Sequence, residues 1–222
     1  MPSLTIENYV KVIYQICSSG NLPCASTGEL ATALTISPGS VTSMLKTLHE
    51  SGLVKYKPYE GVQLTASGET LALRVLRRHR LIELFLVETL DLSWDEVHEE
   101  AENMEHAVSD LLIDRIDQYL GCPPTDPHGD PIPKADGTVA PASAQPLIEL
   151  DVQTSFQLVR VIDQTPEFLR YLSDAGLILG THGIVTENQQ EAGTITLQIS
   201  GAATVLSHNA AEKLLVETVE TG

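Results

Sequence analysis

Cysteine is scarce in this 222-residue chain, and its three cysteines follow neither a disulfide nor a metal-binding pattern. Cys17, Cys24 and Cys122 are odd in number and lack CxxC spacing, which argues against a disulfide framework and against a thiolate zinc site. No apolar run approaches the roughly 18 residues that a membrane span requires. The N-terminus also lacks the basic and apolar segments of a secretion signal. We therefore expect a cytoplasmic protein that does not bind membranes.

Basic residues are scarce as well, since 13 Lys and Arg stand against 30 Asp and Glu, for a net charge of −17. That balance is unusual for a nucleic-acid-binding protein, but the charge is uneven. Residues 1–80 hold eight Lys and Arg and five Glu, whereas residues 81–222 hold five basic and 25 acidic residues. A mildly basic N-terminal module can still dock on phosphates through one face.

The N-terminal third has the pattern of a winged helix. Apolar residues recur with helical spacing over residues 5–19, and Ser26 with Glu29 forms a potential capping box for a short second helix. Residues 36–39 then break the pattern before helical spacing resumes over residues 40–48, as in a helix-turn-helix. A β-hairpin over residues 52–64, with a turn at Pro58–Gly61, completes the predicted winged helix.

Two further helices are predicted over residues 66–89 and 93–120, followed by a Pro-, Gly- and Asp-rich connection over residues 121–146. Beyond Leu147 the chain changes to short β-like runs, which predict a small barrel-like domain with one helix at Pro166–Asp174. The runs are residues 156–162, 183–186, 194–199, 203–206 and 214–219.

The densest group of metal-type ligands lies in residues 77–106. His79 and Glu83 are four residues apart on the first of these two helices. On the second, His98, Glu102, Glu105 and His106 follow i, i+4, i+7, i+8 spacing, which predicts one stripe of a helix. Facing helices can bring several oxygen and nitrogen donors onto one divalent cation. The alternative is a solvated helix face with ordinary i, i+4 pairs.

These residues carry a resemblance to a known family. The blocks RRHRLIELFL, WDEVHEEAENMEHAVSD and DPHGDPIP, in this order behind a winged helix, resemble the diphtheria toxin repressor family of metal-dependent transcriptional regulators, especially its manganese-responsive branch. The resemblance covers essentially the whole chain and implies a multidomain, mainly α fold with a small β part. Its expected parts are a winged helix-turn-helix DNA-binding domain (1–65), a helical dimerisation and metal-binding domain (66–140), a linker (141–150) and an SH3-like β-barrel (151–222).

The same resemblance implies two metal sites in each subunit. The primary site falls on Asn8, Glu102, Glu105 and His106, and the ancillary site falls on His79, Glu83 and His98 with Gln164 and Glu167 of the C-terminal domain. In the family the last two positions are Glu and then Gln, so their order is exchanged here. Asp126, His128 and Asp130 also resemble ligands, but we assign them to turn chemistry in a Pro- and Gly-rich loop.

Three departures from family patterns bear on the metal. Iron-responsive members carry Cys at the position of Glu102 and Met at that of Asn8, so this primary site has only oxygen and nitrogen donors, which favour Mn²⁺. The manganese branch usually has Asp where Asn8 stands. Lys11 occupies the place of a Glu ligand in the short manganese regulators, which argues against their closely spaced metal pair and favours two separate sites.

For DNA binding, the resemblance implies that the second helix of the helix-turn-helix motif enters the major groove. The candidate contacts are Ser37, Pro38, Gly39, Ser40 and Ser43 on that helix, with Lys46, Lys55 and Lys57 as phosphate contacts. Short side chains can meet thymine methyl groups or phosphates but cannot read a base with two hydrogen bonds. A symmetric homodimer would recognise an inverted-repeat operator in double-stranded DNA.

We therefore expect a manganese-dependent repressor of metal-homeostasis genes that binds two ions per subunit, is not an enzyme and has no small organic substrate. An iron-dependent repressor with Fe²⁺ and the same architecture is the nearest alternative. A metal-dependent hydrolase would need an open coordination position in a substrate pocket, and the sequence has no HExxH signature. A metal-stabilised scaffold without a regulatory role is a third alternative, which the basic N-terminal balance disfavours.

Overall fold

The computed structural model describes residues 3–19, 24–141 and 144–219, which form two compact units. The first unit contains the residues up to His79, 102–114 and 133–139, and the second contains 80–101, 115–132 and the residues from 140 onward. Met1 and Pro2, on which the absence of a secretion signal partly rests, lie outside the described residues. So do residues 142–143 of the expected linker and the last three residues of the expected C-terminal domain.

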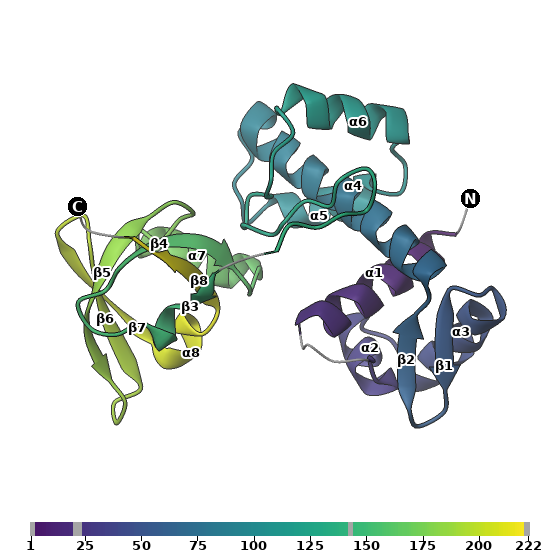
Figure 1. Ribbon diagram of the computed structural model, residues 1–222, viewed down its shortest axis with the longest axis horizontal. Helices are drawn as coiled ribbons and strands as arrows, with labels where there is room; N and C mark the ends of the chain where they lie inside the picture. Colours follow the sequence, from purple (N-terminus) through teal and green to yellow (C-terminus); the bar gives the residue numbers. More distant parts are fainter. Residues whose placement is uncertain (1–2, 20–23, 142–143, 220–222) are drawn as a thin grey trace. The chain divides into compact units, whose positions relative to one another are not determined.

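The first unit begins with the predicted winged helix (Figure 1). Its elements are α1 (Leu4–Ser19), α2 (Thr27–Ala33), α3 (Pro38–Glu50), β1 (Val54–Lys57) and β2 (Gly61–Leu64). The capping box at the start of α2 is present, because Ser26 accepts from the Glu29 amide and Glu29 accepts from the Ser26 amide. Ile13, Leu45 and Val62 are among the buried apolar residues that hold the three helices and the hairpin together.

Three helices follow: α4 (Ala66–Leu90), α5 (Val97–Met104) and α6 (Asp110–Tyr119). The prediction of one helix over residues 93–120 was wrong, because the chain leaves the helix after Met104 and restarts at Asp110. The Ser109 hydroxyl accepts from the Leu112 amide at 3.3 Å, as a helix N-cap does. Glu105 and His106 therefore lie in a turn beyond α5 and do not continue its stripe.

The second unit contains a six-stranded antiparallel sheet in the order β3-β8-β4-β5-β6-β7, which confirms the predicted SH3-like domain. In chain order its elements are β3 (Gln145–Pro146), η1 (Leu147–Glu149), β4 (Ser155–Val161), α7 (Pro166–Asp174), β5 (His182–Gln189), β6 (Thr194–Ile199), β7 (Ala202–Ser207), α8 (His208–Ala211) and β8 (Leu214–Thr218). Figure 1 shows the strands curving around a common interior. Leu147 and Leu150, expected in the linker, are buried in this core.

The Pro- and Gly-rich loop before the sheet is fastened to strand β4. Asp126 Oδ1 accepts from the amides of His128 at 2.8 Å and Asp130 at 2.9 Å, and the His128 carbonyl accepts from the Val161 amide at 2.9 Å. Gly129 has a φ of 86°, and a Cβ atom there would overlap the carbonyl oxygen of Val159. Only glycine therefore allows the loop to approach β4 this closely. Among the described residues, no helix is long and apolar enough to cross a membrane.

Candidate metal centre

Charged and imidazole side chains from α1, α4, α5 and the turn after α5 converge inside the first unit. The Nδ1 atom of His106 lies 2.6 Å from Glu7 Oε2, and the Nδ1 atom of His79 lies 2.6 Å from Glu105 Oε2. Glu105 is completely buried. The structure thus brings Glu102, Glu105 and His106 together, as expected for the primary site, and adds Glu7.

Lys11 provides the positive charge within this cluster. Its Nζ atom donates to Glu102 Oε1 and to Glu105 Oε1, both at 2.6 Å, and the residue is 4% exposed. Burial alone would raise the pKa of Glu105, but the hydrogen bond from His79 and the charge of Lys11 outweigh it and hold that pKa below its ordinary value. Glu105 is therefore an ionised carboxylate at neutral pH.

Sequence reasoning missed both Glu7 and the contacts of Lys11. The two residues are four apart, so they share a face of α1, and that spacing was the available signal. Charged residues are rarely buried unless they are paired, and both are buried here. The face of α1 that carries them is therefore a polar contact surface for the turn after α5.

Two atoms of the cluster show that its residues fit a divalent cation. The Glu7 carboxylate accepts, so His106 Nδ1 carries a proton, and in the neutral ring Nε2 presents a lone pair. That Nε2 atom is buried without a hydrogen-bond partner, 3.2 Å from Glu105 Oε1, so two acceptors face each other. Asn8 Oδ1 is likewise buried without a partner. A cation among these groups would satisfy the two unpartnered atoms, and oxygen with imidazole nitrogen suits a divalent ion such as Mn²⁺.

A second cluster, Glu83, Asp126 and His128, lies buried in the second unit, with one ligand atom of each residue within 4.8 Å of the others. His128 Nε2 lies 2.7 Å from the Trp94 carbonyl oxygen, to which it must donate, so in the neutral ring Nδ1 holds the lone pair. This Nδ1 atom is buried without a hydrogen-bond partner, 3.8 Å from Glu83 Oε2. Metal-binding histidines commonly donate their other ring N–H to a carbonyl in this way.

Turn chemistry therefore explains only part of the loop. It explains the hydrogen bonds of Asp126 Oδ1, which organise the turn. It does not explain the position of His128, whose ring approaches Glu83, a residue of α4. Burial and the negative charges of Asp130 and Glu83 raise the pKa of Asp126 well above its usual range, although the nearby Arg80 opposes the shift. The sequence contained the signal, since Asp and His are separated by one residue within DPHGDPIP.

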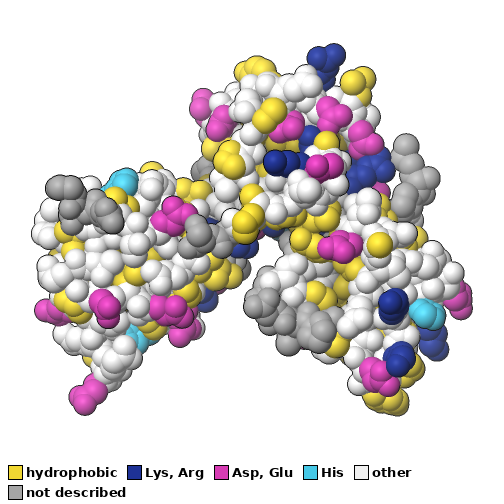
Figure 2. All heavy atoms as spheres, in the orientation of Figure 1, with side chains coloured by type: hydrophobic (Ala, Val, Ile, Leu, Met, Phe, Trp, Pro, Cys, Tyr) yellow, Lys and Arg dark blue, Asp and Glu magenta, His cyan; other side chains and the backbone are white. Residues whose placement is uncertain are grey.

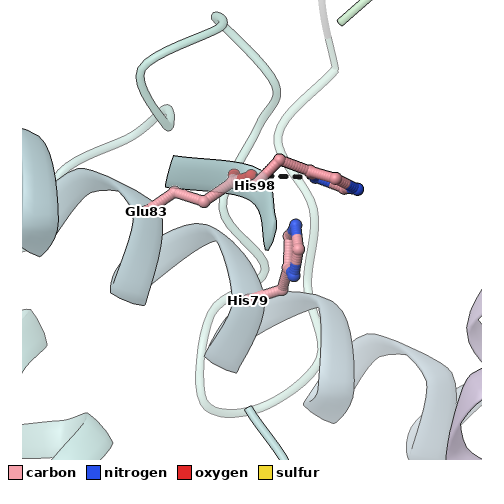
Figure 3. Close-up of side chains that lie close together, drawn as sticks. All are labelled: His79, Glu83 and His98. Atoms are coloured by element: carbon pink, nitrogen blue, oxygen red, sulfur yellow. Dashed lines mark hydrogen bonds and ion pairs between the residues drawn. The ribbon is translucent and has the colours of Figure 1, made fainter. Parts of the chain in front are cut away.

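The expected ancillary ligands are only partly gathered. Figure 3 shows the side chains of His79, Glu83 and His98 close together, with His98 Nδ1 3.2 Å from Glu83 Oε1. The Gln164 amide donates instead to Asp130 Oδ2 at 3.2 Å. Glu167 is exposed in the first turn of α7, where its charge favours the helix N-terminus. Gln164 and Glu167 therefore do not join His79, Glu83 and His98 in this structure, contrary to the expected ancillary site.

The candidate DNA contacts lie on one exposed part of the winged helix. Ser37 caps α3 by accepting from the Ser40 amide at 3.2 Å, and Ser37, Pro38, Gly39, Ser40 and Ser43 are all exposed. Lys46, Lys55 and Lys57 are exposed as well, and Figure 2 shows dark blue side chains over α3 and the β1–β2 hairpin. Lys57 forms an ion pair with Glu60 at 3.1 Å. Both side chains are exposed to solvent, so the pair is weak and leaves the Lys57 ammonium group able to contact a phosphate.

Three family models match successive parts of the chain. The model described as the iron dependent repressor N-terminal DNA binding domain matches residues 1–62. The iron dependent repressor metal binding and dimerisation domain matches residues 65–134, and the FeoA domain matches residues 145–218.

Individual proteins match over nearly the full length. The iron-dependent repressor IdeR of Mycobacterium tuberculosis is 31% identical over 228 residues, covering 97% of both chains. The diphtheria toxin repressor of Corynebacterium diphtheriae is 30% identical and covers 96% of both. A solved manganese-dependent transcriptional repressor in complex with manganese is 39% identical, with a TM-score of 0.87, covering 96% of this chain and 100% of the other. The solved manganese regulator SloR is 31% identical, with a TM-score of 0.78, covering 96% of this chain and 98% of the other.

Proposed function

Because the chain belongs to the family of iron-dependent and diphtheria toxin repressors, which are metal-dependent transcriptional repressors, we propose that the metal it senses is Mn²⁺. The observation that carries this proposal is the donor set of the primary centre. Asn8, Glu102, Glu105 and His106 offer oxygen and nitrogen and no sulfur, and such ligands favour Mn²⁺ over softer ions. The similarity to manganese-dependent repressors supports the same metal, whereas the iron-dependent relatives keep Fe²⁺ as the alternative.

The primary ion would act by connecting two segments of the first unit. Asn8 lies on α1, whereas Glu105 and His106 follow α5, so an ion held by all three fixes the winged helix to the helical region. In a homodimer this would set the spacing of the two α3 helices for successive major-groove faces of an inverted-repeat operator. A partner subunit would cover apolar side chains such as Leu111 and Leu112, which are exposed on α6.

A second ion would bind at Glu83. The lone pair of His128 Nδ1 directed toward Glu83 supports Asp126 and His128 as its companions. Of the set expected from the sequence, His98 approaches the other oxygen of Glu83 at 3.2 Å. We propose that the His128 side is the stronger half of this site, because its histidine is oriented by a carbonyl and fully buried.

Fluorescence anisotropy on an inverted-repeat promoter fragment tests this function. We expect tight binding of the full chain to DNA with Mn²⁺ and weak binding with a chelator, and we expect Glu105→Gln to remove the difference. Anaerobic Fe²⁺ in a parallel titration separates the two candidate metals. DNA affinity that is the same with Mn²⁺, Fe²⁺ and chelator would show that the protein is not a metal sensor.

A further inference from the structure

The ammonium group of Lys11 lies where two proposed ligands of the primary ion converge. Glu102 Oε1 and Glu105 Oε1 both accept from it at 2.6 Å. An oxygen that receives a short hydrogen bond from an ammonium group cannot direct the same lone pair to a metal ion. The metal-free arrangement of the ligands is therefore held together by a cation that belongs to the protein itself.

Both oxygens of Glu105 already have partners, because Oε1 accepts from Lys11 and Oε2 lies 2.6 Å from His79 Nδ1. Each carboxylate oxygen has a second lone pair, but a divalent ion bound to Oε1 would lie beside the Lys11 ammonium group and be repelled by it, which favours withdrawal of Lys11. Lys11 has a flexible four-carbon stem that can withdraw, whereas a histidine ring is more restricted by its two side-chain torsions. Withdrawal of Lys11 removes the ammonium group from Glu102 Oε1 as well, so one movement changes the surroundings of two proposed ligands.

The charges favour the same exchange. Glu7, Glu102 and Glu105 bring three carboxylate groups to a largely buried cluster, and the Lys11 ammonium group contacts two of them. Buried carboxylates without a cation would repel one another at a high cost. Lys11 offsets that repulsion, so it stabilises the metal-free protein and lowers the gain from binding an ion.

We propose that Lys11 is a built-in competitor for the primary ion, which must displace the Lys11 ammonium from Glu102 and Glu105 in order to bind. The inference rests on the proposed function, since it needs that ion. The competition weakens the affinity for Mn²⁺ and so raises the metal concentration at which the repressor responds. In the metal-free protein the same contact holds α1 to the end of α5.

Isothermal titration of the full chain with Mn²⁺ tests the competition. In Lys11→Met the competitor is removed and the carboxylates keep their charge, so the dissociation constant should fall roughly tenfold or more. Lys11→Arg keeps the cation and should show no such gain. Lys134→Met, which changes an exposed lysine outside the cluster, is the matched control and should equal the native protein.

An unchanged or weaker affinity in Lys11→Met would overturn the inference while leaving the proposed function intact, provided that the native protein binds Mn²⁺. A native protein that binds no Mn²⁺ would refute both. Because Lys11→Met can misfold, acetylation of native lysines by acetic anhydride gives a second measurement. Mass spectrometry should show that Mn²⁺ speeds modification of Lys11 relative to Lys134, and an unchanged or lower ratio would also overturn the inference.

Discussion

Glu7 accepts a 2.6 Å hydrogen bond from Nδ1 of His106 and thereby directs the Nε2 lone pair of the ring toward Glu105. Glu7→Leu should weaken Mn²⁺ binding about 10–100-fold, because the ring loses the partner that fixes its proton and orientation. Calorimetric titration measures this change. Glu100→Gln removes an exposed carboxylate and should have no comparable effect. An equal loss of Mn²⁺ affinity in both variants would mean that the net charge of the protein, and not the contact between Glu7 and His106, determines the affinity.

Glu102 should control metal preference. Glu102→Cys introduces a thiolate, so the affinities for Fe²⁺, Co²⁺ and Zn²⁺ should rise relative to that for Mn²⁺. Competition with a fluorescent chelator, carried out under anaerobic conditions, gives the ranking. Glu102→Asp keeps oxygen ligation and should retain the native order. A ranking that does not change in the Cys variant would show that Glu102 does not ligate selectively.

His128 should be required for the second ion and not for the first. His128→Phe keeps an aromatic ring that can stack on Trp94, as the native ring does at 6.1 Å, but removes the ligand nitrogen. The number of Mn²⁺ ions per subunit, measured by elemental analysis after gel filtration, should fall from two to one. His98→Ala distinguishes the other half of the site: if it abolishes the second ion and His128→Phe does not, the expected ancillary set is the correct one.

Asp163 should stabilise the C-terminal domain in a pH-dependent way. Burial raises its pKa, but Lys213 at 2.8 Å and the hydrogen bonds from Thr165 outweigh burial and lower the pKa below 3.8. A depressed pKa in the folded state means that stability is present above the ordinary pKa and is lost as pH falls through the folded one. Asp163→Asn should therefore cost about 0.5–1 kcal/mol at pH 7, because solvent screens the pair with the partly exposed Lys213 and Asn can still accept from Thr165.

The fluorescence of Trp94, whose ring packs on the C-terminal core, reports urea unfolding of this domain. The difference between native protein and Asp163→Asn should begin to shrink as pH falls below the ordinary pKa of an aspartate, where the unfolded chain takes up the proton first, and should vanish as the folded carboxyl is protonated. Asp174→Asn, at an exposed position of α7, is the control. A difference that stays constant down to pH 3 would show that the charge of Asp163 is not its source.

Lys46 on α3 should contribute a phosphate contact. Lys46→Ala should weaken DNA binding in the presence of Mn²⁺ by a similar factor for operator and unrelated sequences, and lower the salt slope of log K by about 1. Anisotropy at several salt concentrations measures both quantities. Lys134→Ala, outside the winged helix, should leave the slope unchanged. A loss confined to the operator would instead indicate that Lys46 reads bases.

Local signals predicted much of the fold. The helix at Pro166–Asp174 begins and ends at the predicted residues, because Pro at the first turn and an apolar face are both visible in the sequence. The break after Met104 was not predictable in this way. Residues 93–120 have continuous helical periodicity, and the turn instead places Glu105 against Lys11 and His79, which are distant in sequence.

The candidate site shows the same limit. Family motifs supplied Glu102, Glu105 and His106, and the structure gathers them. Spacing could show that Glu7 and Lys11 share a helix face and that Asp126 and His128 are close, but not which side chains they meet across long sequence separations. The proton position on each histidine and the ion pairs of Lys11 depend on which oxygen lies opposite each nitrogen, and only the folded structure places those oxygens.

The fit of Gly129 against Val159 ties the second cluster to the C-terminal sheet. The loop that carries Asp126 and His128 has its backbone partner on β4, so it takes this shape only where that strand is present. The primary centre needs nothing from the sheet, since its residues all belong to the first unit. If both proposed sites bind metal, a chain shortened after α6 would keep the residues of the primary site and lose Asp126 and His128, so the C-terminal part would set how many ions each subunit binds.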